Sequence, residues 1–316
     1  MDNKHQVQII EIKLIKRVLR ACIQENLLQY FVENNILTIE LKKSNMKIVV
    51  EDVKTFALGK FKLNGEVFLY EGQSSSKLTS VINLLQLIQP ELIDNTTNIK
   101  WDKFVAEVNN CLENDQLTTE QIFAVNQQLT QEISNSPYNS FIEFIALGLN
   151  TAEQLMFFER WSASGHPLHP CHRTKLGLTK EEYIKFSPEF DQNIGLSLIA
   201  IHNSLAHIES QVSDVNYHQW FAGTFPMQWQ AWRIEMDENN LPINNYCPIF
   251  IHPWQYNNVI SNMFSGLIQE RKLILFENIK IVTQSSISFR TLISKENVYH
   301  PHIKLPVSIQ STRYFH

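Results

Sequence analysis

GHPLHPCHRTKLGL, residues 165–178, carries three histidines, an arginine and a lysine on a backbone with two prolines. Proline fixes φ, lacks an N–H group and disfavours helical geometry in the residue before it, so His166 and His169 are expected to be extended. A rigid loop that presents several hydrogen-bond donors suits an anionic ligand, such as a nucleotide phosphate or a carboxylate. The stretch therefore predicts an anion-binding loop, close to the point where the composition of the chain changes.

Two other interpretations of this loop stay open. The first is an ordinary solvated turn, although clustered histidines on a stiffened loop do nothing for stability. The second is a zinc site made by His166, His169 and His172. No carboxylate lies close by in the sequence to complete it, and Arg173 and Lys175 would repel the cation. An anion site is favoured, and no residue is assigned as a metal ligand.

The whole chain has the composition of a folded globular protein, with 316 residues of which 44% are hydrophobic and 19% charged. This length favours two domains over one. The net charge of −5 argues against nucleic-acid binding, which needs a basic surface. Four scattered cysteines without a Cys-x-x-Cys spacing fit a reducing compartment. Charged residues interrupt the first apolar segment and all later ones, so a cytoplasmic location without membrane spans is expected.

Upstream of the loop, residues 1–157 are expected to form an α+β domain with a helix, a small antiparallel sheet and further helices. Helical periodicity is found at 6–31, 78–92 and 99–133, and β-prone runs lie near 36–42, 46–51, 55–62 and 66–71. Asn64-Gly65 stands between the last two runs and is typical of a two-residue hairpin turn.

Downstream, residues 158–316 are expected to form a mixed α/β domain. Most prolines and five of the six tryptophans follow Phe157, which places the domain boundary near 155–160. The patterns predict a helix over 191–210, buried strands at 248–251 and 279–283, and an apolar run at 302–310 that Lys304 and Pro306 interrupt.

FIHPWQ, residues 250–255, is a second candidate for a functional segment. It is a β-like run that ends abruptly at His252. A histidine at the end of a strand beside a cleft is often functional. It is also often structural, with both ring nitrogens holding neighbouring loops, and the structural interpretation is favoured here.

SSISFRT, residues 285–291, and Lys304 form the third candidate. In an extended run, hydroxyl side chains two residues apart lie on the same face as Arg290. Lys304 stands alone in an apolar stretch, and a buried lysine needs an anionic partner, either a protein carboxylate or a ligand phosphate. The alternative is that Lys304 lies at a strand edge and reaches water.

Taken together, these segments resemble the siderophore synthetases that work without a nonribosomal peptide synthetase, the aerobactin-synthetase (IucA/IucC-like) family. Residues 165–178 are similar to the family signature Gly-His-Pro-x-His-Pro-x-x-Lys-x-Arg-x-Gly-Phe. His-Pro-Trp-Gln at 252–255, Ser-x-Arg-Thr at 288–291 and Lys-Leu-Pro at 304–306 resemble the other family motifs in the same order. Four ordered motifs are far more specific than one.

The resemblance implies an enzyme that uses ATP and Mg²⁺ to adenylate a carboxylate of citrate or of a citrate-derived acid. An amine or hydroxyl group then attacks the acyl adenylate and releases AMP. The family fold has a thumb, fingers and a palm, so residues 1–157 would be thumb-like and 158–316 fingers-like. Family members are often dimers, and a homodimer is carried over as an expectation.

Residue roles follow from the same resemblance. The ATP phosphates would be held by Ser288, Arg290 and Lys304, together with His169, Arg173 and Lys175 of the loop. Of these, His169, Arg290 and Lys304 would be catalytic. His166, Thr312 and Arg313 would lie near the substrate carboxylates.

Three departures from the family pattern affect these expectations. The signature lysine and arginine are exchanged, as Arg173 and Lys175, which keeps the charge but not the forked geometry of each position. His316 stands where an arginine is expected, and Arg313 is the nearest replacement. Family members are also about twice as long, and their palm carries the magnesium ligands. The alternative function is therefore an inactive fragment or a non-catalytic protein that binds ATP or carboxylates.

Overall fold

The structure is a computed structural model that describes residues 3–57, 60–93, 98–161, 165–166, 168–211, 215–297 and 299–311. The chain forms two compact units, each assembled from segments that are distant in the sequence. Unit 1 comprises Met1–Val125, Ser164–Gly177 and Gln310–His316, and unit 2 comprises Asn126–Ala163 and Leu178–Ile309. These units are defined by packing. The predicted domains 1–157 and 158–316 were based on the composition along the chain, and they stay a prediction.

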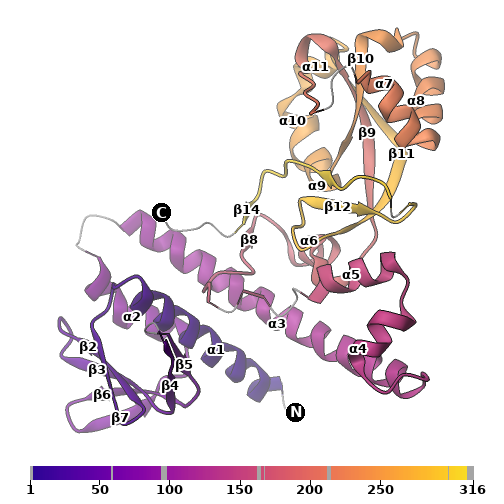
Figure 1. Cartoon of the computed structure of the whole chain (residues 1–316). Helices are drawn as coiled ribbons and strands as arrows, with labels where there is room; N and C mark the ends of the chain where they lie inside the picture. Colours follow the sequence, from indigo (N-terminus) through magenta and orange to yellow (C-terminus); the bar gives the residue numbers. More distant parts are fainter. Residues whose placement is uncertain are drawn as a thin grey trace. The chain divides into compact units, whose positions relative to one another are not determined.

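Unit 1 has the expected α+β architecture, with an antiparallel sheet of order β1-β2-β3-β6-β7 and three helices (Figure 1). The strands of this sheet are β1 (Tyr30–Glu33), β2 (Ile36–Leu41), β3 (Met46–Val50), β6 (Val67–Glu71) and β7 (Ser74–Lys77). The short strands β4 (Val53–Thr55) and β5 (Phe61–Leu63) pair with each other, and β8 (Lys175–Leu176) pairs with β14 (Gln310–Ser311). The helices are α1 (Asn3–Gln24), α2 (Val81–Leu92) and α3 (Asn98–Ser134), whose last residues belong to unit 2.

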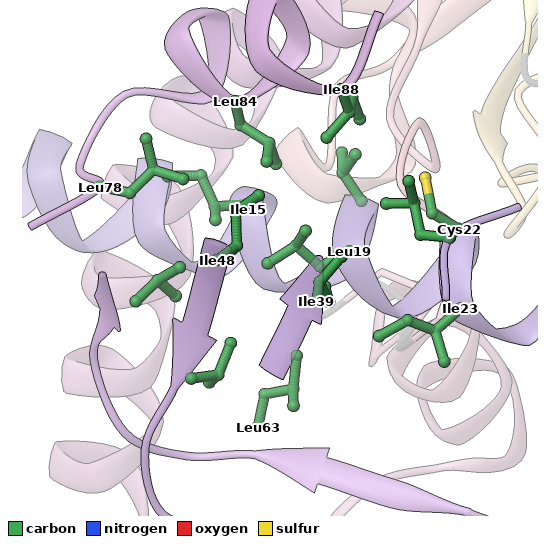
Figure 2. Packing of buried hydrophobic residues seen from close by; sticks show 14 of the residues in the cluster. Ile15, Leu19, Cys22, Ile23, Ile39, Ile48, Leu63, Leu78, Leu84 and Ile88 are labelled. Carbon is green, nitrogen blue, oxygen red and sulfur yellow. The ribbon is translucent and has the colours of Figure 1, made fainter. Parts of the chain in front are cut away.

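The core of unit 1 lies between the sheet and the apolar faces of α1 and α2. Ile15 and Leu19 of α1 are fully buried, as are Ile39 of β2 and Ile48 of β3. Figure 2 shows these side chains together with Leu84 and Ile88 of α2 in one cluster. Burying such a side chain contributes about 2 kcal/mol, so this cluster holds the helices on the sheet.

The hairpin predicted at Asn64-Gly65 is wrong, because β5 and β6 on either side of it pair with different strands. β5 pairs with β4, and β6 pairs with β3. Gly65 instead lies against the backbone of the opposite chain segment, where its N–H donates to Glu51 O at 3.0 Å. A Cβ atom at Gly65 would lie 2.2 Å from that oxygen. The glycine therefore permits a close backbone approach, and the chain reverses between β4 and β5.

Unit 2 contains a second antiparallel sheet, of order β10-β9-β11-β12-β13. Its strands are β9 (Ile194–His202), β10 (Tyr246–Ile251), β11 (Leu273–Ser285), β12 (Thr291–Ser294) and β13 (Ile303–Lys304). Its longer helices are α5 (Thr151–Trp161), α6 (Lys180–Phe186), α7 (Tyr217–Thr224) and α8 (Pro226–Glu238). Shorter helical segments are α4 (Phe141–Glu143), α9 (Pro253–Gln255), α10 (Ser261–Met263) and α11 (Ser265–Gln269). The strands expected at 248–251 and 279–283 are confirmed as parts of β10 and β11.

The helix predicted over 191–210 is wrong, because this segment forms the central strand β9. β9 pairs with β10 on one side and with β11 on the other. Leu196, Leu198 and Ala200 are fully buried, and the neighbouring Ile199 is 2% exposed. A strand buried on both faces reads as a continuous apolar run, which periodicity cannot distinguish from a buried helix.

In the part of the chain that the structure describes, no helix combines the length and the apolar character needed to cross a membrane.

Candidate functional site

The loop 165–177 lies in unit 1, where a carboxylate on α3 ties it to two arginines. Arg173 Nε donates to Asp115 Oδ1 at 2.6 Å, and Arg17 Nη2 of α1 donates to Asp115 Oδ2. All three side chains are largely buried: Arg173 is 5% exposed, Arg17 16% and Asp115 10%. Arg173, predicted to bind phosphate, is thus part of a buried ion network that anchors the loop.

The ring of His172 completes this network. Arg17 Nη1 is 2.9 Å from His172 Nδ1, and His172 Nε2 is 3.4 Å from Asp115 Oδ1. Burial alone would raise the pKa of Asp115, but the hydrogen bond from His172 and the charges of Arg17 and Arg173 hold it well below its usual range. Burial and the charge of Arg17 lower the pKa of His172 against the opposing effect of Asp115. The imidazole is therefore neutral near pH 7 and is held inside the network.

Gly165, the first residue of the loop, packs directly on this ring. Its φ of +76° is in the left-handed region. A Cβ atom there would lie 2.2 Å from His172 Nε2. Both the backbone angle and the available space therefore require glycine.

His166 and His169 stabilise the turn of the loop through their Nδ1 atoms. His166 Nδ1 accepts from the backbone N–H of His169 at 2.9 Å, and His169 Nδ1 accepts from that of Cys171 at 3.1 Å. The His166 side chain is exposed and that of His169 is half-buried. Their roles toward a ligand stay predictions.

Lys175 is buried at 9% exposure and lies on β8. Its backbone N–H donates to Asn110 Oδ1 on α3 at 2.9 Å, and its residue pairs with Ser311 of β14. Thr312 and Arg313, expected near the substrate carboxylates, lie outside the described residues. Asn110, Asp115 and Arg17 were missed by the sequence analysis, because no local pattern shows which helix side chains face the loop.

Ser288 and Arg290 lie in unit 2, in the tight turn that joins β11 to β12. The N–H of Thr291 donates to Ser288 O at 2.8 Å, and the N–H of Ser288 donates to Ser286 Oγ at 3.1 Å. Arg290 Cζ lies 4.4 Å from the centre of the Phe289 ring. Ser288 and Arg290 are both half-buried.

The segment Val307–Ile309 joins Arg290 to the predicted second motif. Arg290 Nη2 donates to the carbonyl oxygens of Val307 at 3.3 Å and Ile309 at 2.8 Å. From the other side, Gln255 Oε1 accepts from the N–H of Ser308 at 2.9 Å. Segments 252–255, 288–291 and 304–309 are therefore brought together within unit 2.

Lys304 lies on the edge strand β13, opposite Thr291 of β12. Its side chain is exposed, so the expectation of a buried lysine that needs an anionic partner is wrong. The β-strand alternation directs it to solvent while Val307 and Ile309 further along are buried. The alternative interpretation, a lysine at a strand edge, is confirmed.

His252 follows β10 and is fully buried. Its Nδ1 accepts from the N–H of Trp254 at 3.1 Å and caps α9, while its Nε2 has no partner among the residues that the structure describes. Burial, with the charges of Arg290 and Lys185, lowers the pKa of His252 to about 4. His252 is therefore a neutral imidazole at pH 7.

Unit 2 contains a cavity of about 800 Å³, and His252 is one of the residues that line it. Its walls are mostly apolar and aromatic, and include Tyr217, Trp220, Phe221, Phe225, Ile251 and Leu305. His252, Gln255 and Lys304 are among its polar lining residues, and no carboxylate is part of the described lining. The electrostatic character of this cavity thus favours an anionic or neutral ligand over a cationic one.

The predicted site residues fall into two groups: the loop in unit 1 and the cluster around Arg290 in unit 2. In the described ranges there is no group of three or more His, Cys, Asp or Glu side chains placed to hold a metal ion. Magnesium stays a prediction for this chain, and no step is derived through a metal.

Comparisons with known proteins show the family to which the chain belongs. The sequence profile of a family described as the IucA / IucC family matches residues 154–315. D-ornithine–citrate ligase of Staphylococcus aureus is 23% identical over 88% of this chain and 40% of its own length. The chain spans about half the length of the curated relatives it matches.

Solved structures show the same fold. The petrobactin biosynthesis protein AsbB from Bacillus anthracis superposes with a TM-score of 0.74 and 17% identity, over 97% of this chain and 47% of that one. The ATP-bound aerobactin synthetase IucA from Klebsiella pneumoniae superposes with a TM-score of 0.66 and 16% identity, over 95% and 49%.

Proposed function

The chain belongs to the IucA/IucC family, and from this premise we propose that it serves an ATP-dependent siderophore synthetase that adenylates a carboxylate of citrate or of a citrate-derived acid. The relative named as a D-ornithine–citrate ligase supports citrate as the acid, and the ATP-bound relative supports ATP as the second substrate. The product of the complete reaction is an amide or ester used in siderophore biosynthesis.

The observation that carries this proposal is the joining of three separate segments in unit 2. The N–H of Leu305 donates to Arg290 O at 2.8 Å, and Arg290 holds the segment that Gln255 also binds. Lys304 of β13 pairs with Thr291, the first residue of β12, which directly follows Arg290 in the sequence. Lys304 lines the cavity, whose described lining holds no carboxylate, and the Arg290 guanidinium is bound to the segment 307–309 that follows it; such charges suit a polyphosphate.

In the proposed first step, a citrate carboxylate oxygen attacks the α-phosphorus of ATP. A new C–O–P bond forms, the bond from the α-phosphorus to the bridging oxygen breaks, and pyrophosphate leaves. Arg290 and Lys304 would offset the repulsion between carboxylate and triphosphate and stabilise the charge that develops on the phosphoryl oxygens. Ser288 is proposed as a hydroxyl donor to the phosphates, and His169, Arg173 and Lys175 of the loop stay predicted phosphate contacts.

In the second step, the nitrogen of an amine or the oxygen of a hydroxyl attacks the acyl carbon. The bond to the adenylate oxygen breaks, AMP leaves, and the nucleophile loses its proton. We propose His166, Thr312 and Arg313 as contacts of the substrate carboxylates. A cytoplasmic location fits the four cysteines, which are all free and buried, and a homodimer stays a prediction.

Isotope exchange of pyrophosphate into ATP tests the adenylation directly. The chain is incubated with ATP, Mg²⁺ and labelled pyrophosphate, with and without citrate. We expect exchange that depends on citrate and falls at least tenfold in Lys304→Ala. As a matched control, Lys62→Ala removes an exposed strand lysine in unit 1 and is expected to leave exchange unchanged.

The alternative function, binding without catalysis, makes a different prediction in the same assay. Uptake of ATP or citrate in a titration, without exchange under any condition, would support a non-catalytic binding protein and contradict the adenylation proposed for this chain.

A further inference from the structure

The turn of residues 286–290 joins β11 to β12, and its own hydrogen bonds set its shape. The N–H of Ser286 donates to Thr291 O at 2.9 Å, and the N–H of Thr291 donates to Ser288 O at 2.8 Å. Ser285, the last residue of β11, donates from its Oγ to a backbone carbonyl of α6 at 2.7 Å. These bonds fix the base and the curvature of the turn, but none of them holds its tip.

The tip of the turn, Ile287, is bound by a carboxylate from a helix that is distant in the sequence. The N–H of Ile287 donates to Glu159 Oε2 at 2.7 Å, across 128 residues of sequence. Glu159 lies in the last turn of α5, and both α5 and the turn belong to unit 2. A hydrogen bond to a charged acceptor is about twice as strong as one between neutral groups. Glu159 therefore ties the tip of the turn to α5.

Packing of the Ile287 side chain does not replace this bond. Ile287 is 66% exposed, whereas Phe289 is 4% exposed and belongs to the core of unit 2. A segment with few buried apolar contacts opens easily unless polar contacts hold it. Ser288 thus stands between one residue that is fixed by burial and one that is fixed through Glu159. The direction of the Ser288 hydroxyl depends on both.

From this geometry we infer that Glu159 is a positioning residue: its carboxylate holds the Ile287 N–H and thereby aims the Ser288 hydroxyl at the phosphates. The inference rests on the proposed function for phosphate as the ligand of Ser288. Glu159 acts through the turn and not by contact, because a carboxylate beside a phosphate would repel it. It lies outside the four sequence motifs and adds α5 to the elements that build the site.

Two substitutions of Glu159 separate the hydrogen bond from the charge. Glu159→Ala removes the acceptor, whereas Glu159→Gln keeps a side-chain oxygen of the same reach and removes only the charge. We expect the alanine variant to weaken phosphate binding about tenfold, because the hydroxyl donor is no longer aimed at the anion, and the glutamine variant to retain most of the affinity. Stronger phosphate binding in both variants would show that the charge matters and the hydrogen bond does not, and would contradict the inference.

The matched control is Glu153→Ala on the same helix. Glu153 Oε2 also accepts from a backbone N–H, that of Asn150 at 2.9 Å, but this bond lies at the start of α5. The same type of contact is therefore lost without any effect on the turn of residues 286–290. We expect the affinity for phosphates to stay at the wild-type value.

The experiment is isothermal titration of each folded variant with ATP and with sodium pyrophosphate, and it includes Ser288→Ala and the double variant with Glu159→Ala. If Glu159 acts through the Ser288 hydroxyl, its removal causes no further loss once that hydroxyl is absent. Wild-type affinity in Glu159→Ala, or losses that add up in the double variant, would overturn the inference alone. A wild-type chain that binds neither ligand would overturn it together with the proposed function. Phosphate binding without pyrophosphate exchange would leave it standing while contradicting the proposed adenylation.

Hydrogen exchange of the Ile287 amide gives a test that needs no ligand. In chains labelled with ¹⁵N-isoleucine, we expect this amide to be protected in the wild type and in Glu153→Ala. It should exchange at least tenfold faster in Glu159→Ala, since its acceptor is gone. An unprotected Ile287 amide in the wild type would overturn the inference even if Glu159→Ala does not fold.

Discussion

Gly165 packs directly against the ring of His172, so that a Cβ atom on Gly165 would lie 2.2 Å from His172 Nε2. The ring cannot move away easily, because Arg17 and Asp115 hold its two nitrogens. The shape of the loop is therefore set by a glycine, a histidine ring and an ion network together.

Gly165→Ala is expected to lower the free energy of unfolding by about 3 kcal/mol, combining backbone strain with overpacking. Gly72→Ala is the control, because Gly72 also has a positive φ, of +59°, but nothing lies within 4 Å of its Cβ position. It should cost about 1 kcal/mol from strain alone. Urea unfolding measures the free energy of unfolding of both variants. Equal losses would show that the His172 ring moves aside to make room for the Cβ atom.

Asp115→Asn is expected to destabilise the chain by about 3–5 kcal/mol, because it leaves two buried arginines without their carboxylate. Glu66→Gln, which breaks the exposed pair of Lys77 and Glu66, should cost less than about 1 kcal/mol. Urea unfolding at neutral pH distinguishes the two. Similar small costs for both would mean that the Arg17 and Arg173 charges find other partners.

Asp115 also predicts how stability depends on acid. Its folded pKa lies below its unfolded value of 3.8, so its stabilising contribution is present above that value and is lost as the pH falls through the folded pKa. Asp115→Asn should therefore be less sensitive to strong acid than the wild type. Unfolding free energies measured below pH 4 check the sign of this difference.

His252 predicts a second, milder acid effect. Its pKa falls from 6.5 to about 4 on folding, so the unfolded chain binds a proton in this window that the folded chain does not. Stability is therefore fully present above pH 6.5 and is lost as the pH falls toward 4, by about 3 kcal/mol. His252→Asn should remove this part of the pH dependence. An unchanged slope in urea unfolding across the window would contradict the assignment.

Lys304→Ala separates binding from folding. The side chain is exposed on the edge strand β13, so the unfolding free energy should change by less than about 0.5 kcal/mol. Affinity for ATP should fall about tenfold if the lysine neutralises a phosphate. Titration and urea unfolding of the same preparation test both expectations, and wild-type affinity would remove Lys304 from the site.

Sequence patterns predicted correctly the helices and strands that bury only one face. The helix of residues 81–92 and the strands at 36–41 and 46–50 each bury one face, so their periodicity is visible. The strand Ile194–His202 is covered on both sides, and its apolar run gave the wrong prediction of a helix. The hairpin at Asn64-Gly65 was predicted wrongly, because an Asn-Gly pair looks the same in the sequence whether its glycine forms a hairpin turn or permits a close backbone approach.

The motifs of the candidate site can be recognised in the sequence, whereas the partners that their side chains bind cannot. Residues of one motif are adjacent in the sequence, whereas Asp115 and Arg17 reach the loop from α3 and α1. The charge of Lys185 on α6 likewise acts on His252 from a distant part of the sequence. Such partners depend on how helices are rotated in the packed unit, which no local pattern records. The exposure of Lys304 depends likewise on β13 being the last strand of its sheet.

The pairing of Lys175 with Ser311 has a consequence for the order of folding. β8 finds its partner strand only after the whole of segment 178–309 has been synthesised. Contacts of such high sequence separation form late, because the chain between them must first be closed into a loop. We expect amide hydrogen exchange during refolding to protect α1, α2 and their sheet before Lys175 and Leu176. The loop 165–177 would then acquire its final form among the last parts of the protein.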